Sequence, residues 1–491
     1  MYMVPTPAFR RLLAALLVVG GLSTAAVASG SAGAETSWPA AAPKATCGPG
    51  SLPETSWQGR VPKVDYDSGR AAKGYFCNTR QVAHQGASGG FKVQRYTDPA
   101  GHTCAFYDST LVAGRDVLSN TLNGSGLGVQ VLDMTNPATP RKTAGLITPA
   151  MLSPHETLVL NRKRGLLAAV MGTLATLPGV LDVYDVKSDC RHPKLLSTSP
   201  MGILGHESGF APDGRTLWSA GVAGTLAAID LTDPRLPKLV KLQTGVVYHG
   251  VRLSPDGRTM YVANIGNPSL SGLTGGGLRI LDVSQVQDRV PNPQIKVLSD
   301  VSWKELSIPQ VAEPFTKDGR RYVLEVDEFI DLFSLQALTS MKTSPVGAAR
   351  IIDVTDPVHP TIVSNLRLEA HQPWRRDAEW GDPGASFPAQ GYAAHYCSLP
   401  RTDAPKLVGC SMILSGLRLF DISDLRHPKE AAYFNRPVVA SKTPVFLPPA
   451  VGSWAMSAPA YDAARGQVWY TDGNSGFYVV QLTNGTAALL K

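Results

Sequence analysis

One phrase recurs along the chain and constrains its fold more than any other feature. It is clearest at residues 347–360, GAARIIDVTDPVHP, where a glycine is followed by an apolar run, an aspartate and a Thr-Asp-Pro turn. Such a phrase is typical of one β-strand and its exit turn. We find seven copies, anchored by Asp133, Asp185, Asp230, Asp282, Asp353, Asp421 and, in a degenerate last copy, Gln481.

The spacing of the copies predicts the architecture. Successive anchors lie 52, 45, 52, 71, 68 and 60 residues apart. Repeats of about 40–50 residues made of short strands are typical of β-propellers, with one repeat per blade. Asp-Gly turns at 213–214, 256–257 and 318–319 add a hairpin to three of the repeats. We therefore predict an all-β, seven-bladed β-propeller of four-stranded antiparallel blades.

The ends of the chain predict how the ring closes. Little sequence follows Gln481, so the last repeat lacks a good outer strand. We expect residues 75–82 to supply it, because an N-terminal strand in the last blade removes exposed sheet edges. The predicted divisions are a signal peptide at 1–34, an irregular N-terminal arm at 35–74 and the propeller at 75–491.

The repeated phrase resembles the LVIVD repeat of secreted and cell-surface β-propeller proteins. The resemblance covers about four hundred residues, since it rests on the seven copies counted above. It implies the propeller fold, and it implies little about chemistry, because that family has little established biochemistry.

Features of the N-terminus and the cysteines predict export. Arg10 and Arg11 precede an apolar run at 12–27 and two small-x-small cleavage sequences, which is typical of a signal peptide. The run is shorter than the roughly 20 residues that span a bilayer, and no later stretch is long and apolar enough to do so, so we expect no membrane span after signal removal. The protein should be secreted, extracellular or at the cell surface. Six cysteines in such a chain predict up to three disulfides, and Cys397 and Cys410, which flank a predicted hairpin, are the first pair to expect.

Charge and motifs restrict the partners. The formal net charge is +7, but no block of Lys and Arg is present, so nucleic acid is not an expected partner. The catalytic patterns GxSxG and HExxH are absent; the His-Glu pairs at 155–156 and 206–207 lack the second histidine. We expect a monomer whose partner is an extracellular protein, a glycan or a small molecule.

Histidines recur at one position, immediately before or within each predicted inner strand. Because inner strands surround a propeller's channel, these side chains should form a ring at one level. Imidazole, carboxylate and thioether groups are suitable ligands for copper or zinc. The predicted ring consists of His84, His155, His206, His249, Glu313, His395 and Met456.

A ring of seven is too wide for one ion to touch every member. We therefore predict the adjacent trio His155, His206 and His249 as the metal ligands. The alternative is that the histidines only hydrogen-bond the backbone of the next blade or water in the channel.

Other polar groups are expected to be structural. The anchoring aspartates should bond their own backbone two residues on, and His192, His359 and His427 should belong to the turns before proline. We expect the acidic group Glu325, Asp327, Glu328 and Asp331 to form a solvated face. Two excursions, 327–347 and 369–390, interrupt the repeat and are either surface loops or functional ones.

Two functions remain open. The first is an extracellular binding or interaction scaffold that uses the channel mouth and the long loops. The alternative is a metal-dependent oxidoreductase or hydrolase, with copper or zinc at the histidine ring in the central channel. Bound metal distinguishes the two.

Overall fold

The computed structural model describes residues 38–109, 126–171, 179–221, 224–269, 272–329, 345–387, 390–439 and 451–491. The predicted signal peptide at 1–34 lies outside these residues. The described chain is mostly strand, and its short helices are α2 (Lys63–Asp67), α4 (Pro149–Leu152), α5 (Ser284–Gln287), α7 (Arg376–Glu379) and the 3-10 turns η1 (Ala71–Lys73), η3 (Pro200–Gly202), η4 (Glu369–His371), η5 (Pro373–Arg375) and η6 (Thr486–Leu490).

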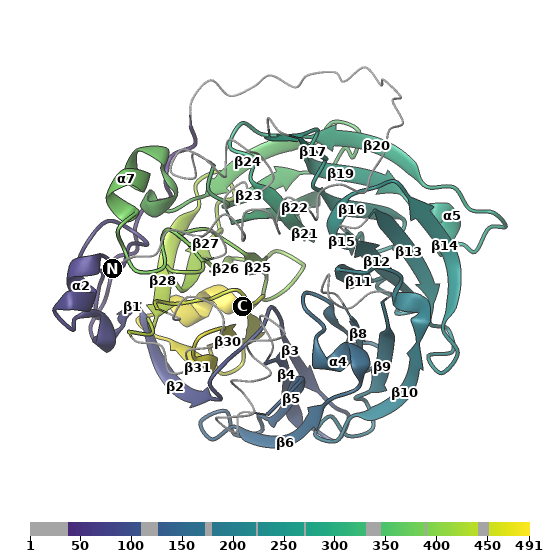
Figure 1. Ribbon diagram of the computed structural model, residues 1–491, viewed down its shortest axis with the longest axis horizontal. Coiled ribbons are helices and arrows are strands. Elements are labelled where there is room, and N and C mark those ends of the chain that lie inside the picture. Colours follow the sequence, from purple (N-terminus) through teal and green to yellow (C-terminus); the bar gives the residue numbers. More distant parts are fainter. Residues whose placement is uncertain are drawn as a thin grey trace, which may run out of the picture. The chain divides into compact units, whose positions relative to one another are not determined.

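Seven antiparallel sheets follow one another along the chain, which confirms the seven-bladed β-propeller. Figure 1 shows the first strand of a blade nearest the centre and the last strand at the rim. The first three blades are β3 (Val93–Thr97), β4 (Thr103–Asp108), β5 (Val129–Asp133) and β6 (Arg141–Leu146); β7 (Leu158–Asn161), β8 (Leu166–Val170), β9 (Leu181–Asp185) and β10 (Lys194–Ser199); and β11 (Glu207–Phe210), β12 (Thr216–Gly221), β13 (Thr225–Asp230) and β14 (Lys238–Thr244).

The remaining blades repeat this order, with a small hairpin of β17 (Asn267–Ser269) and β18 (Gly272–Thr274) between two strands of blade four. Blades four to seven are β15 (Tyr248–Leu253), β16 (Thr259–Asn264), β19 (Gly277–Asp282) and β20 (Lys296–Val301); β21 (Ile308–Lys317), β22 (Arg320–Glu328), β23 (Ala349–Asp353) and β24 (Thr361–Leu366); β25 (Tyr396–Ser398), β26 (Leu407–Ser411), β27 (Leu417–Asp421) and β28 (Lys429–Asn435); and β29 (Ala460–Asp462), β30 (Gln467–Asp472) and β31 (Gly476–Leu482).

The core consists of apolar layers between successive blades. A middle strand such as β8 is buried at every position, because a neighbouring blade covers each of its faces. The outer strand β14 instead contains only exposed and half-buried residues. One layer joins Val183 of blade two to Ile229 of blade three.

The anchoring aspartates have the predicted local role. In the six copies that carry an aspartate, a carboxylate oxygen accepts the backbone N–H two residues on, at 2.7–3.0 Å, which fixes the exit from the third strand. The donors are the backbone N–H groups of Thr135, Lys187, Thr232, Ser284, Thr355 and Ser423.

An N-terminal strand closes the ring in the last blade, as predicted. It is β2 (Thr79–Gln85), which pairs antiparallel with β31. The predicted strand at 75–82 is nevertheless divided, because Asn78 has a φ of 54° and turns the chain. The residues before this turn form β1 (Tyr75–Cys77), a fifth strand that pairs with β28 at the edge of blade six.

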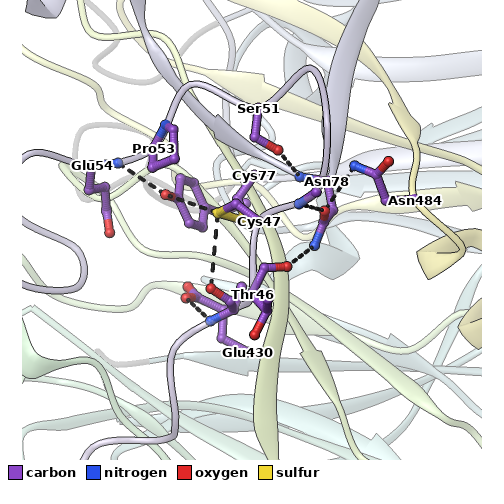
Figure 2. Close-up of a disulfide and its surroundings, with 12 residues drawn as sticks. Thr46, Cys47, Ser51, Pro53, Glu54, Cys77, Asn78, Glu430 and Asn484 are labelled. Atoms are coloured by element: carbon purple, nitrogen blue, oxygen red, sulfur yellow. Dashed lines mark hydrogen bonds between the residues drawn. A yellow bond between two sulfur atoms is a disulfide. The ribbon is translucent and has the colours of Figure 1, made fainter.

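The N-terminal arm is attached where these two strands meet. Figure 2 shows Asn78 beside the Cys47–Cys77 disulfide, with Thr46 and Asn484 close to its amide. Asn78 Nδ2 donates to the Thr46 carbonyl at 3.0 Å, and Asn78 Oδ1 accepts from Asn484 Nδ2 at 3.0 Å. The arm is therefore bound to the strands that close the ring.

The protein has three disulfides. Cys397 and Cys410 lie directly opposite each other on β25 and β26, which confirms the predicted pair. The others join Cys47 to Cys77 and Cys104 to Cys190. Three disulfides are typical of a protein that folds in an oxidising compartment. No helix in the described ranges is long and apolar enough to cross a membrane.

The expected solvated acidic face is wrong for its described members. Glu325 and Asp327 are fully buried, because both pair with the buried Arg350, whose Nη2 is 3.2 Å from Asp327. Glu328 is buried too, and Asp331 lies outside the described residues, as does 330–344 of the first excursion.

The second excursion packs against the N-terminal arm. Its α7 follows η5, and the Trp57 indole N–H of the arm donates to Glu379 at 2.7 Å. Arg60 of the arm pairs with Asp382 at 2.8 Å. Residues 388–389 of the second excursion lie outside the described chain.

Candidate metal centre

Glu156 is the centre of a group of buried and partly buried polar side chains from five blades. It lies just before β7, and its side chain is 2% exposed. Its Oε2 atom is 2.9 Å from His249 Nε2 and 3.2 Å from His206 Nε2, whereas Oε1 is 3.3 Å from His395 Nε2. We call the group the histidine–carboxylate cluster; its members are His155, Glu156, His206, His249, Gln310, Glu328 and His395.

The structure brings together the trio singled out from the sequence. His155 and His206 lie just before the first strands of blades two and three, and His249 lies in β15 of blade four. The ring centroids of His155 and His206 are 4.6 Å apart, and those of His206 and His249 are 4.9 Å apart. His395, from blade six, joins the cluster through Glu156. Blades two and six are not neighbours, so these side chains meet near the axis.

Two of the imidazoles are held by the backbone of the next blade. His249 Nδ1 is 2.9 Å from the carbonyl of Pro309, and His395 Nδ1 is 2.8 Å from the carbonyl of Met456. A carbonyl oxygen only accepts, so each Nδ1 carries a proton and donates. Both rings therefore direct Nε2 at the carboxylates. Metal-binding histidines are commonly oriented in this way.

Glu328 and Gln310 complete the cluster from blade five. Glu328 ends β22, and its Oε2 lies 2.7 Å from His395 Nε2. The Gln310 amide N–H donates to Glu156 Oε1 at 2.6 Å. Gln310 thus takes the inward position at which blades three and four carry a histidine.

Two buried polar atoms of the cluster, His155 Nδ1 and Gln310 Oε1, have no hydrogen-bond partner among the described residues. Glu328 Oε2 and His395 Nε2 instead form an ion pair with each other at 2.7 Å. A buried unsatisfied polar group costs about 1–3 kcal/mol, so the two unpartnered atoms point to a ligand.

The charges of the cluster are interdependent. Burial opposes the positive charge on His249, but Glu156 and Glu328 outweigh it and raise its pKa to about 9. For His395, burial is likewise outweighed by Glu328 and Glu156, and its pKa is about 9. Burial also opposes the charge on Glu156, but the imidazoles hold its pKa well below the usual range.

His155 behaves differently from the other imidazoles. Burial and the nearby charge of His206 lower its pKa to about 3. It is therefore neutral at physiological pH, and its Nδ1 has no partner within the described part of the chain. A neutral imidazole with an unused nitrogen is ready to bind a metal ion.

Three members of the predicted ring lie elsewhere. His84 is on β2, the outer strand of blade seven, so its predicted place near an inner strand is wrong. Glu313 lies three residues beyond Gln310, and its carboxylate pairs with Arg252 at 2.7 Å. Met456 contributes its carbonyl to the cluster, while its side chain packs in the apolar core.

Sequence reasoning missed Glu156, Gln310 and Glu328. The His-Glu pair at 155–156 carried a signal for Glu156, because adjacent residues entering a strand can both reach one site. For Glu328 there was only an acidic run, in which the neighbouring Asp327 pairs with Arg350 instead.

A second charged group lies next to this cluster on the same inner strands. Lys92 Nζ is 2.7 Å from Glu207 Oε1 and 3.7 Å from the ring centre of Tyr396. Arg252 bonds Glu207 at 3.0 Å and Glu313 at 2.7 Å. These five residues, the Glu207 cluster, come from blades one, three, four, five and six, so their side chains also meet near the axis.

Comparisons with known proteins identify no family for this chain. No protein-family model matches the chain, and no curated protein matches it. Similar solved structures include a putative 6-phosphogluconolactonase from Bacteroides fragilis (12% identity, TM-score 0.43, 72% of this chain and 88% of that chain covered). The β-propeller domain of Cps50 (Swd1) from Myceliophteria thermophila matches at 11% identity and a TM-score of 0.46, over 82% and 98% of the two chains. A functionally unknown protein from Desulfotomaculum acetoxidans matches at 12% and 0.42, over 70% and 89%.

Proposed function

We propose that the protein is a secreted β-propeller of the LVIVD-repeat kind that binds a copper or zinc ion in its histidine–carboxylate cluster. One observation carries the proposal: donor atoms of His155, Glu156 and His206 lie within 4.8 Å of one another. His249 Nε2 approaches the same Glu156 oxygen as His206, at 2.9 Å from Oε2. Imidazole and carboxylate ligands at such spacing suit zinc and copper.

The partial exposure of the metal-binding side chains supports a site at which water or a substrate can also bind the ion. His206 is 16% exposed and His155 is partly exposed, whereas Glu156 and His249 are buried. An ion held from the buried side keeps a coordination position toward solvent, which is typical of catalytic rather than structural metal sites. The activity that follows is that of a metal-dependent oxidoreductase or hydrolase.

Export is part of the same proposal. The signal-like sequence at 1–34 and the three disulfides support a secreted or cell-surface location. The repeated phrase supports the assignment to the LVIVD-repeat kind.

The second candidate is a contact scaffold for an extracellular protein, glycan or small molecule. It is favoured by the excursion at 369–387, which packs on the N-terminal arm and leaves the Trp374 side chain 65% exposed. An exposed tryptophan on an ordered surface is a common centre of binding energy. Absence of metal binding would leave this function as the better one.

His155→Asn is the sharpest test of the metal site. His155 has a φ of 50°, a conformation that asparagine tolerates well, and its Nδ1 bonds no described residue. We expect the free energy of unfolding of the metal-free variant to fall by about 0.5–3 kcal/mol, because asparagine loses the ring contacts with Phe91 and His206. Its zinc and copper affinity should fall at least tenfold, which is about 1.4 kcal/mol.

The measurement is metal titration of the chelator-treated mature protein by calorimetry, with metal content checked by elemental mass spectrometry. His359→Asn is the matched control, since the His359 side chain is 80% exposed and pairs with Asp356 in its own turn. Equal affinity in wild type and His155→Asn would remove His155 from the site. A wild type that binds neither metal would refute the metal centre.

A further inference from the structure

The two oxygens of Glu156 face different groups of side chains. Oε2 lies near His206 and His249, at 3.2 and 2.9 Å. Oε1 lies near His395 and Gln310, at 3.3 and 2.6 Å. A carboxylate placed in this way has one oxygen available to each side.

The Oε1 side has its own set of possible metal ligands. Donor atoms of Glu156, Glu328 and His395 lie within 4.8 Å of one another. All three residues are buried, and His395 is fully so. This set shares only Glu156 with the set formed by His155, Glu156 and His206.

Three charged groups converge on this side. His395 Nε2 forms an ion pair with Glu328 Oε2 at 2.7 Å and lies 3.3 Å from Glu156 Oε1. Because His395 Nδ1 donates to the Met456 carbonyl, Nε2 is the nitrogen left to bind a ligand. A divalent cation would displace the Nε2 proton and bind this nitrogen and the two carboxylates.

We propose that Glu156 bridges two metal ions, and that Glu328 and His395 hold the second, a divalent cation. This inference rests on the proposed function, because the first ion is the one bound by His155, Glu156 and His206. In known two-metal sites the ions lie roughly 3.5–4 Å apart, a separation that a bridging carboxylate can span.

The chemistry of the second position differs from that of the first. Its ligands are two carboxylates and one imidazole, a set that suits zinc or manganese better than monovalent copper. Gln310 Oε1 is buried without a partner in the described residues and can accept a hydrogen bond from water on this ion. Two carboxylates do not neutralise two divalent ions, so the second ion should bind more weakly. Paired ions of this kind favour hydrolysis of the two proposed reaction classes.

Glu328→Gln tests the second position. We expect zinc titration of the metal-free mature wild type to give two ions per chain, bound in two steps, and that of Glu328→Gln to give one. Glu313→Gln is the matched control, since it makes the same change on the same blade but outside the cluster, and it should retain two. His155→Asn should instead weaken the first step.

The outcomes separate this inference from the proposed function. One ion per chain in the wild type, unchanged in Glu328→Gln, overturns the second position and leaves the first intact. No bound ion overturns both. A second measurement covers the case in which Glu328→Gln does not fold: electron paramagnetic resonance of wild type with one and two equivalents of divalent copper. A magnetically coupled pair at two equivalents is expected, and two isolated signals would contradict the bridge.

Discussion

Two groups of buried charge lie at successive positions on the same inner strands, and they differ in how completely they are satisfied. In the Glu207 cluster Lys92, Arg252 and Tyr396 all contact Glu207, and within the described chain no buried side-chain nitrogen or oxygen of the five members lacks a hydrogen-bond partner. In the histidine–carboxylate cluster the buried atoms His155 Nδ1 and Gln310 Oε1 do lack one. The polar groups of the Glu207 cluster therefore satisfy one another, whereas the histidine–carboxylate cluster keeps polar atoms that can bind a ligand.

The sequence places the two groups side by side. His206 precedes Glu207, and His395 precedes Tyr396, so one step along a strand separates a ligand from a structural residue. Burial and charge alone do not distinguish the two groups. What distinguishes them is whether the hydrogen bonds of each group are complete.

The largest expected effect comes from removing the centre of the Glu207 cluster. Glu207→Ala leaves Lys92 and Arg252 buried without their shared partner, so the free energy of unfolding should fall by about 3–5 kcal/mol. Urea unfolding measures it. The number of zinc ions bound per folded chain should not change. A loss below about 1 kcal/mol would mean that this group does not stabilise the protein as buried pairs do.

An effect of similar or smaller size is expected from pH in the metal-free protein. The pKa values of His249 and His395 are raised to about 9, so the stability they contribute is complete below about 6.5 and is lost as the pH rises to 9. The pKa of Glu156 is lowered, so its contribution is lost as the pH falls below about 4.5. Metal-free stability from this cluster should therefore be greatest between these values.

Urea unfolding in chelator at about pH 5.5 and about pH 9.5 checks this expectation. A pKa raised from its usual value to about 9 corresponds to a decrease in the free energy of unfolding on the order of 3 kcal/mol between these two pH values. His155→Asn should show the same decrease, because His155 is already neutral at both values. A flat profile would show that the imidazoles are not held as cations by the carboxylates.

The smallest expected effect comes from Glu313. Its side chain is 26% exposed, and it is one of two acidic partners of Arg252. Glu313→Gln should lower the free energy of unfolding, measured with urea, by less than about 1 kcal/mol, as is usual for partly exposed ion pairs. Zinc affinity should be unchanged. A weaker zinc affinity would support the sequence-based placement of Glu313 in the ring and would contradict the division into two groups.

Much of the fold was predictable because its signals are local. Each anchoring aspartate fixes its own strand exit two residues on, so the phrase recurs wherever a third strand ends. The division of the predicted strand at 75–82 was not predictable, since it depends on one left-handed residue, Asn78, held by partners such as Asn484.

The site was predictable only in part, for a related reason. His155, His206, His249 and His395 stand close to the start of the inner strands of blades two, three, four and six, so alignment of the repeats found them. Glu156 and Glu328 contact histidines of other blades near the axis, so their partners depend on which blades face each other. Alternation along β22 also directs Asp327 to Arg350 and Glu328 to His395.

The closing strand has a consequence for the order in which the protein folds. Thr79 pairs with Leu482, about four hundred residues later, so this sheet has a very high contact order. The first residues of the ring must wait until the last strand has formed. We expect the first six blades to form from local hairpins and ring closure to be the slow, final step, so that an unclosed chain presents the free edge of β31 to other chains.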